Sequence, residues 1–299
     1  MPGERHRCQP ACLSRREPQF ATASHVRRWL LIEQEAPWGP TALTQCRLHA
    51  GTARAIAEKA RSAGARPILL RKPGRSQRAG CRVYVAVTDV NQTWVESFDF
   101  PAAEALLALD FSPLKRGASL GGERVTEPFF LVCTHGKHDA CCAQFGRPVA
   151  SALHALDPAS LWECSHIGGD RFAANLLCFP HGLYFGHVTP VVAPRIADLY
   201  RAGRIDLEHY RGRPAYPFAV QAAEWFLRRD SNLDAIDALD LLRHAALAGD
   251  RHQAVFSLQG GRECRVTISV SRDTTPVLLT CQSTEPGAPP RYELVEITR

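Results

Sequence analysis

Five of the eleven cysteines in this 299-residue chain lie between residues 133 and 178, close enough in sequence to suggest metal or redox chemistry. The densest part is the segment CTHGKHDACC (133–142), which follows an apolar run typical of a strand and precedes a predicted helix. Thiolates near a helix N-terminus are stabilised by the helix dipole and by neighbouring Lys and His side chains. Thiolates are also the ligands that soft metals and iron–sulfur clusters require.

A second segment, CSHIGGD (164–170), has the composition of a ligand-binding loop. His166 and Asp170 are separated by three residues, and two of these are glycine. Glycine adopts positive φ without steric cost, so this loop can fold closely around a bulky group. We therefore expect both side chains to face the same site.

Three segments together resemble the sucrase/ferredoxin-like family, whose members are related to thioredoxin-like ferredoxins. These segments are CTHGKHDACC (133–142), WECSHIGGDRFA (162–173) and PHGLYFGHV (180–188). The N-terminal segments RWLLIEQ (28–34) and PWG (37–39) are similar to that family as well. The resemblance covers roughly residues 25 to 200.

The resemblance implies a [2Fe–2S] cluster, with Cys133 and Cys142 at the positions of the first ligand pair. His166 and Asp170 fall at the positions of the second pair, where some relatives have two histidines. Asp170 departs from that pattern, because a carboxylate is a hard and uncommon ligand for such a cluster. Three outcomes are open: Asp170 ligates iron, Cys164 takes its place, or the site binds the cluster weakly or not at all.

Other functions would use the same residues. A thiol–disulfide oxidoreductase would cycle Cys133 with Cys141 or Cys142, although the Cys-x-x-Cys spacing usual for thioredoxins is absent. A degenerate thioredoxin-like protein without a cofactor is a further alternative. No pair of carboxylates is placed for sugar cleavage, so an electron carrier is favoured over a stand-alone hydrolase. A structural zinc site would use Cys133, Cys142, His166 and either Cys164 or Asp170.

The remaining candidates are interpreted as structural. We expect these cysteines to be buried fillers or core residues: Cys46, Cys81, Cys141, Cys178, Cys264 and Cys281. Cys8 and Cys12 could bind a metal together, but one Cys-x3-Cys in a polar segment is weak evidence. His135 and His138 are expected to be solvated loop residues that tune the thiolates.

The predicted elements follow the order β-α-β-β-β-α twice. The first unit has strands at 29–34, 67–71, 81–87 and 93–98, a helix at 50–64 and a short helix at 101–109. The second has strands at 129–132, 161–164, 172–179 and 183–188 and helices at 140–156 and 194–203. This pattern predicts an α/β protein with two thioredoxin-like units in tandem.

A small C-terminal α+β module follows these units. It is predicted to have helices at 217–228 and 233–248, strands at 254–258, 265–270, 277–281 and 292–297, and a hairpin turn at 259–261. The predicted domains are a loosely ordered polar lead-in (1–25), an N-terminal thioredoxin-like domain (26–118), a thioredoxin-like ferredoxin domain with the cluster site (119–204) and the C-terminal module (205–299).

Charge and hydropathy limit the partners. The net charge of +6 comes from Arg residues spread along the chain, without a basic run interleaved with aromatics, so nucleic-acid binding is not expected. A diffuse positive surface favours an acidic redox partner, either a reductase or an acceptor. No apolar run approaches the roughly 20 residues needed to cross a bilayer. The polar N-terminus lacks a secretory signal, so we expect a cytoplasmic protein without membrane association.

Overall fold

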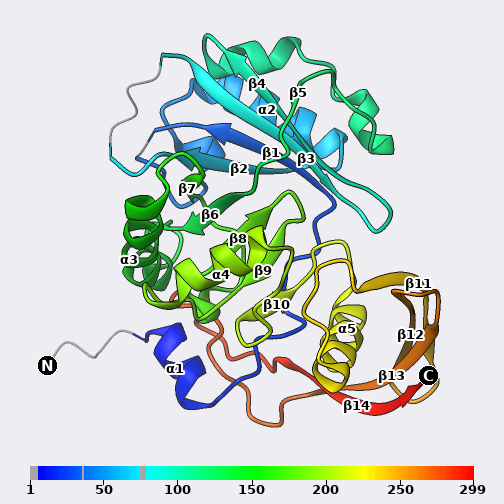
Figure 1. Ribbon diagram of the computed structural model, residues 1–299. Helices are drawn as coiled ribbons and strands as arrows, with labels where there is room; N and C mark the ends of the chain where they lie inside the picture. Colours follow the sequence, from blue (N-terminus) through cyan, green and yellow to red (C-terminus); the bar gives the residue numbers. More distant parts are fainter. Residues whose placement is uncertain (1–5, 36, 75–78) are drawn as a thin grey trace, which may run out of the picture.

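The computed structural model describes residues 6–35, 37–74 and 79–299, and contains two sheets with helices packed against them (Figure 1). The elements up to residue 124 are α1 (Cys8–Ser14), β1 (Arg28–Glu33), η1 (Leu43–Gln45), α2 (Ala50–Ser62), β2 (Arg66–Arg71), β3 (Cys81–Thr88), β4 (Thr93–Phe100), η2 (Ala103–Ala108), η3 (Ser112–Arg116) and β5 (Glu123–Arg124). The next elements are β6 (Phe129–Cys133), α3 (Ala140–Leu156), β7 (Leu161–Cys164), η4 (Asp170–Phe172), β8 (Leu176–Phe179), β9 (Leu183–Phe185), α4 (Val192–Arg201) and β10 (Tyr210–Gly212). The last are α5 (Phe218–Ser231), β11 (Leu239–Leu247), β12 (Arg251–Leu258), β13 (Glu263–Arg272) and β14 (Pro290–Thr298).

The larger sheet has ten strands in the order β10-β9-β8-β6-β7-β2-β1-β3-β4-β5. Its two halves join where β2 pairs antiparallel with β7, through Leu70 opposite Cys164 and Arg71 opposite Glu163. Within each half the pairing directions are the same: β1–β2 and β6–β7 are parallel, and β1–β3, β3–β4, β6–β8 and β8–β9 are antiparallel. The chain is thus a mixed α/β protein, as the strand and helix alternation predicted, and one large curled sheet runs through both halves.

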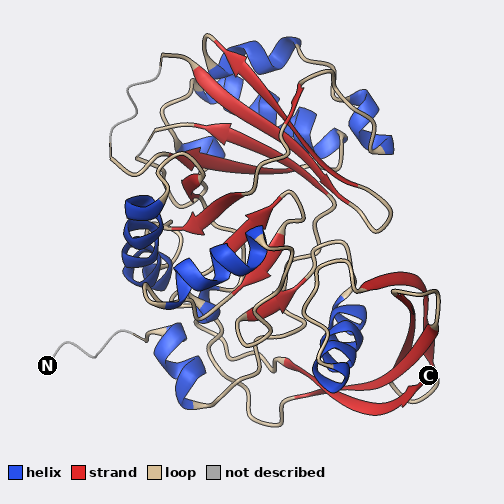
Figure 2. Cartoon of the chain, viewed as in Figure 1, coloured by secondary structure: helices blue, strands red, loops and turns tan. Residues whose placement is uncertain are grey.

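The inner faces of the two halves of the curled sheet pack against each other, and the outer faces pack against helices. Trp29 of β1 meets Phe179 of β8 edge to face with ring centroids 5.5 Å apart, and Tyr84 of β3 stacks on Phe129 of β6 at 4.8 Å. Helix α2 covers the other face of the first half, and α3 and α4 cover that of the second (Figure 2). Apolar burial on both sides explains why most of these strands are continuous hydrophobic runs.

The predicted elements of this sheet are present with small differences. A 3-10 helix, η2, stands where a short helix at 101–109 was expected, and β8 and β9 are shorter than predicted. The 140–156 helix is continuous despite Pro148 inside it. Residues 1–25 were expected to be loosely ordered; residues 1–5 lie outside the described part, but α1 forms in the rest of this segment and buries Cys8 and Cys12.

The C-terminal module is a four-stranded antiparallel sheet, β11-β12-β13-β14, which packs on α5 (Figure 2). The helix predicted at 233–248 is wrong, because β11 occupies most of it and pairs with β12 along its whole length. The Ala and Leu residues there favour a helix locally, but the strand ladder decides the conformation. The strand predicted at 277–281 is also wrong, since only an isolated bridge between Val277 and Gly287 forms.

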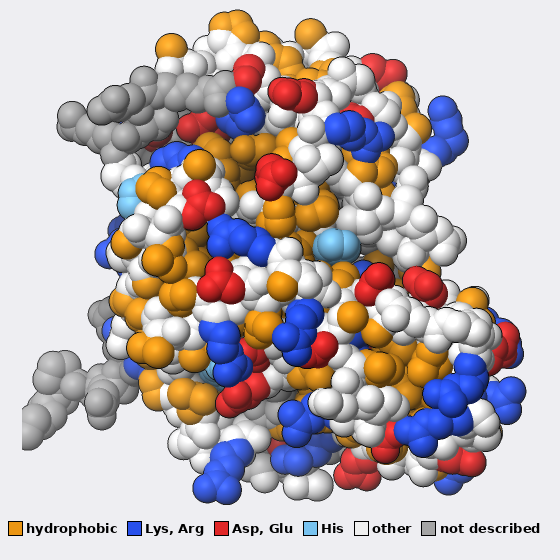
Figure 3. Space-filling model, viewed as in Figure 1, with side chains coloured by type: hydrophobic (Ala, Val, Ile, Leu, Met, Phe, Trp, Pro, Cys, Tyr) orange, Lys and Arg blue, Asp and Glu red, His pale blue; other side chains and the backbone are white. Residues whose placement is uncertain are grey.

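The surface mixes charges of both signs. On the face shown in Figure 3, Lys and Arg side chains are interspersed with Asp and Glu side chains and with hydrophobic areas. Among the described residues, no helix is long and apolar enough to cross a membrane.

Candidate metal centre

The predicted ligands meet at one end of the larger sheet. Cys133 is the last residue of β6, and it pairs with Cys164, the last residue of the parallel neighbour β7. Cys142 lies in the first turn of α3, and His166 and Asp170 lie on the loop that follows β7. The carboxyl ends of parallel strands share one edge of a sheet, so the two predicted segments necessarily approach each other there.

The side chains of the four principal candidates converge. Ligand atoms of Cys133, Cys142 and His166 all lie within 4.8 Å of one another. The Cys142 thiol donates a hydrogen bond to Asp170 Oδ1 at 3.1 Å, and Nδ1 of His166 lies 2.9 Å from the same oxygen. Cys164 is fully buried beside Cys133 but is outside this close group.

The loop from His166 to Asp170, called the ligand loop below, takes its shape from two glycines and a buried arginine. Gly168 and Gly169 have φ of +100° and +81°, in the left-handed region that favours glycine. Arg211 of β10 donates hydrogen bonds to Gly168 O (3.0 Å) and to Asn175 Oδ1 (2.7 Å), and Asn175 donates to Gly169 O (2.8 Å). A Cβ on Gly169 would collide with the Arg211 guanidinium. Arg211 therefore holds the loop backbone in place, although no motif in the sequence points to this residue.

A third glycine fixes the distance between helix and strand. Gly146 of α3 faces the backbone of Cys133, and a Cβ there would collide with the Cys133 carbonyl oxygen. The absence of a side chain at Gly146 therefore lets α3 approach β6. That approach positions Cys142 beside Cys133.

Hydrogen bonds give the thiols unequal acidity. Hydrogen bonds from Cys142 and then Cys164 hold the pKa of Cys133 well below its usual value despite its burial, and His166 contributes in the same direction. The hydrogen bond to Cys133 and burial raise the pKa of Cys142, and burial followed by the bond to Cys133 raises that of Cys164. Cys133 is thus the most acidic thiol of the group.

The imidazole and the carboxylate form an ion pair. Burial alone would lower the pKa of His166, but hydrogen bonds to Asp170 and Cys133 raise it to about 9. Burial alone would raise the pKa of Asp170, but the hydrogen bond to His166 lowers it. A bound metal would replace the protons on the imidazole and the thiols, so its affinity depends on pH.

Two histidines of the first segment surround His166. The ring of His138 stacks on that of His166, with centroids 3.7 Å apart. His135 accepts a hydrogen bond from the His166 backbone N–H (3.3 Å), and its Nε2 lies 2.8 Å from Gly39 O. The expectation that His135 is solvated is wrong, because it is only 3% exposed. His138 is partly exposed, and it joins His166 and Asp170 as a possible further ligand.

The site approaches the surface through histidine. The side chain of His166 is 21% exposed, whereas Cys133, Cys142 and Cys164 are almost completely buried. His166 and the stacked His138 are therefore more exposed to solvent than the three cysteines of the site.

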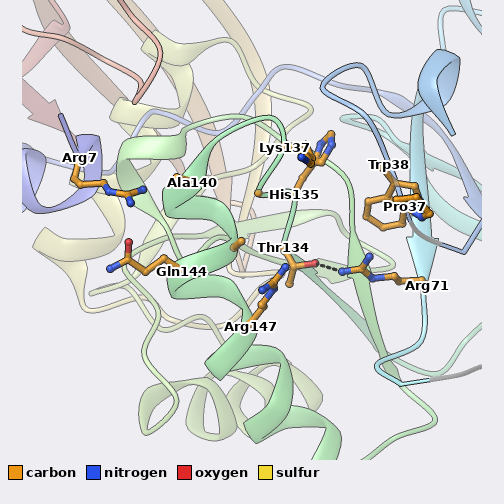
Figure 4. A pocket seen from close by; sticks show the side chains of 12 residues that line it. Arg7, Pro37, Trp38, Arg71, Thr134, His135, Lys137, Ala140, Gln144 and Arg147 are labelled. Carbon is orange, nitrogen blue, oxygen red and sulfur yellow. Dashed lines mark hydrogen bonds between the residues drawn. The ribbon is translucent and has the colours of Figure 1, made fainter. Parts of the chain in front are cut away.

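A basic cavity of about 550 Å³ lies beside the site, between the loop after β6, α3 and the segment around Trp38 (Figure 4). Its cationic side chains come from Arg7, Lys137, Arg147 and Arg71, and no Asp or Glu lines it among the described residues. Arg71 is paired with Glu163 at 2.5 Å. The other three give the cavity its positive charge.

The fold and the site together define an α/β protein with a cysteine- and histidine-lined centre at the ends of parallel strands. Residues 20–212 match the family model described as Sucrase/ferredoxin-like, and the chain belongs to that family.

Individual relatives match smaller parts of the chain. "Altered inheritance of mitochondria protein 32" of Eremothecium gossypii is 28% identical over 111 residues, which are 32% of this chain and 36% of that protein. The protein of the same name from Saccharomyces kudriavzevii is 30% identical over 105 residues, 30% of this chain and 34% of that protein. The match therefore spans about a third of the length of these relatives.

Two solved structures also match. They are cysteine-to-serine variants of the thioredoxin-like [2Fe-2S] ferredoxin from Aquifex aeolicus, 15% and 16% identical, with TM-scores of 0.26 and 0.25. Each match covers 28% of this chain and 97% of the ferredoxin.

Proposed function

We propose that this protein is an electron carrier that holds a [2Fe–2S] cluster with Cys133, Cys142, His166 and Asp170. The observation that carries the proposal is the convergence of these four side chains at the end of β6. Thiolate and imidazole donors suit iron–sulfur centres, and the family membership agrees with this use. When bound, such a cluster supplies one-electron oxidation and reduction.

The surrounding residues have distinct roles in this proposal. Cys133 and Cys142 bind from the buried side, and His166 binds at the edge nearest the surface. Asp170 is the fourth ligand because its Oδ1 lies against both Cys142 and His166. We assign Cys164 as a hydrogen-bond donor to the Cys133 sulfur. The two thiols share a hydrogen bond, and Cys164 lies outside the group formed by Cys133, Cys142 and His166.

A single zinc ion is the second candidate for this site. A tetrahedral zinc with bonds of about 2.0–2.3 Å keeps its ligand atoms about 3.3–3.8 Å apart. The Cys142–Asp170 separation of 3.1 Å is nearer to that value than to the wider spacing between ligands of different irons in a two-iron cluster. Zinc would make the site structural rather than redox-active.

We also propose that the electron partner is an acidic protein face. The basic cavity lies next to His135 and includes Arg7, Lys137 and Arg147. A complementary acidic surface would be steered there, which raises the rate of encounter. The partner would then lie close to His135, which contacts the backbone of His166.

Two broader predictions stay proposals. The equal strand order of the two half-sheets supports tandem thioredoxin-like units, for which we propose domain boundaries at 118 and 204. A cytoplasmic location also remains a prediction, and imaging of the tagged full chain would test it.

Metal and sulfide analysis of the full chain, purified without oxygen, tests the function. We expect about two irons and two acid-labile sulfides per chain and absorption between about 400 and 600 nm. Cys133→Ser should lose all three signals. Cys46→Ser should keep them, because Cys46 lies outside the site and donates only to Leu43 O.

Two other results of the metal analysis would contradict the [2Fe–2S] proposal. One zinc per site without sulfide would establish the second candidate. A colourless chain after reconstitution with iron and sulfide, with no bound metal, would refute both.

A further inference from the structure

Three other cysteines, far apart in the sequence, meet next to the proposed cluster site. The Sγ atoms of Cys141 and Cys281 lie 3.3 Å apart, and those of Cys281 and Cys8 lie 3.6 Å apart. All three, with a carboxylate oxygen of Asp139, lie within 4.8 Å of one another. Cys8 belongs to α1, Cys141 to the first turn of α3 and Cys281 to the loop between β13 and β14.

Asp139 organises this group. One of its oxygens accepts a hydrogen bond from the Cys141 backbone N–H at 2.8 Å, and the other accepts from the Cys281 N–H at 2.8 Å. The Cys8 thiol lies 3.8 and 3.9 Å from the same two oxygens. The carboxylate is therefore oriented by two backbone donors toward the three sulfurs, as outer contacts orient metal ligands.

The distances suit one tetrahedral ion. Zinc–sulfur bonds of about 2.3 Å place two sulfurs about 3.8 Å apart, and a sulfur and a carboxylate oxygen about 3.6 Å apart. The observed S–S separations of 3.3 and 3.6 Å and S–O separations of 3.8 and 3.9 Å lie near these values. A disulfide would join only two of the sulfurs and would leave the third thiol without a role.

We propose that Cys8, Cys141, Cys281 and Asp139 bind one zinc ion at a structural site separate from the proposed cluster. Thiolates and a carboxylate are ordinary zinc ligands, and four protein ligands close the site. Cys8 and Cys141 are fully buried and Cys281 is half-buried, so the ion is shielded from solvent on most sides.

The bound ion would link α1 and the loop between β13 and β14 to α3, and so to the half of the sheet that contains β6. Consecutive helix residues point about 100° apart, so Cys141 faces this group while Cys142 faces Cys133. An ion held by Cys141 therefore fixes the same helical turn that supplies Cys142. Neighbouring contacts already join the three segments: Gln282 donates to His138 O at 2.5 Å, and His6 Nε2 lies 3.2 Å from Leu278 O.

Zinc and iron analysis of variants of the full chain tests the proposal. Cys281→Ser and Cys8→Ser should each lose about one zinc per chain while keeping the metal bound at Cys133. Cys133→Ser should show the opposite loss, so failure of one site is distinguishable from failure of the other. Cys12→Ser is the matched control, because Cys12 lies one turn further along α1 with its thiol 3.9 Å from His187 Nε2.

Thiol mapping in the unmodified chain covers the case in which a variant does not fold. With zinc bound, Cys8 and Cys281 should resist alkylation, and a zinc chelator should expose both to the reagent. Cys46 should react equally under both conditions. Unchanged zinc content in Cys281→Ser, or a disulfide between Cys141 and Cys281 in protein purified without oxygen, would overturn the proposal.

Discussion

The imidazole ring of His138 lies on that of His166, with centroids 3.7 Å apart and planes inclined by 22°. The contact covers one face of the imidazole ring of the proposed ligand His166, whose side chain is 21% accessible. It also places a second imidazole within 4.8 Å of Asp170. His138 therefore either shields the proposed ligand His166 from solvent or is itself an alternative ligand.

Replacement of His138 by Leu distinguishes these roles. We expect iron and sulfide content to be unchanged after anaerobic purification, because the four proposed ligands remain. Bleaching in air should become several-fold faster, since His166 loses the ring that covers it. The decay of visible absorbance measures this rate. Loss of iron during purification would instead identify His138 as a ligand.

Arg211 is expected to control the site without touching it. Arg211→Met leaves Gly168 O and Asn175 Oδ1 without their donor inside the protein. Unsatisfied buried acceptors should lower the free energy of unfolding by about 2–4 kcal/mol and loosen the ligand loop, so metal content should fall as well. Denaturant unfolding and metal analysis measure the two effects.

The control for Arg211 is Arg204→Met, which removes an exposed ion pair with Asp234. Exposed pairs contribute at most about 1 kcal/mol, so this variant should keep both stability and metal. Equal behaviour of the two variants would contradict a positioning role for Arg211.

Gly146→Ala should damage the site from the helix side. The added methyl meets the Cys133 carbonyl oxygen, so α3 must move away from β6. Overpacking of this kind costs about 1–3 kcal/mol, and the displacement should weaken metal binding at Cys142. The exposed Ser151 on the same helix supplies the control, Ser151→Ala, which should have neither effect. Full metal content in Gly146→Ala would show that the close approach is dispensable.

The convergence of the proposed ligand residues was predictable because they lie in two short segments that follow neighbouring parallel strands. Cys133 and Cys164 end β6 and β7 opposite each other, so sequence order alone brings CTHGKHDACC (133–142) to CSHIGGD (164–170). The two glycines between His166 and Asp170 also predicted a tightly folded loop, and both adopt positive φ.

Long-range contacts were not predictable in this way. Arg211 reaches the ligand loop from β10, and nothing in the local sequence distinguishes it from the other arginines. Cys281 was interpreted as a filler, but it meets Cys8 across 273 residues of chain. β11 was expected to be helical because its own residues favour a helix, while its pairing with β12 is a tertiary effect. Such features depend on partners that a single sequence does not identify.

Mild acid should destabilise the fold through His181. Burial, followed by the charge of Arg213, lowers the pKa of this histidine to about 4, and its Nδ1 lies 2.7 Å from the Tyr200 hydroxyl. The unfolded chain binds the proton near pH 6.5 and the folded chain only near pH 4, so stability is full above 6.5 and falls between these values. The contribution is about 1–3 kcal/mol.

Urea unfolding at pH 7.5 and pH 5 measures this effect. His181→Asn should flatten the difference between the two conditions, although His187 has a similarly lowered pKa and will leave part of the slope. A variant with the same pH dependence as the unmodified protein would exclude His181 as a source.

The basic cavity should govern the rate of electron exchange with anions. Lys137→Gln combined with Arg147→Gln removes two of its positive charges but none of the proposed ligands. Reoxidation of the reduced protein by ferricyanide should slow by about 3–10-fold at low ionic strength, and the difference should shrink in high salt because the attraction is screened. A neutral quinone oxidant should react equally with both proteins, and Lys115→Gln, an exposed charge outside the cavity, should leave the ferricyanide rate unchanged. If the double variant keeps the original rate and salt dependence, electrons leave the site by another face.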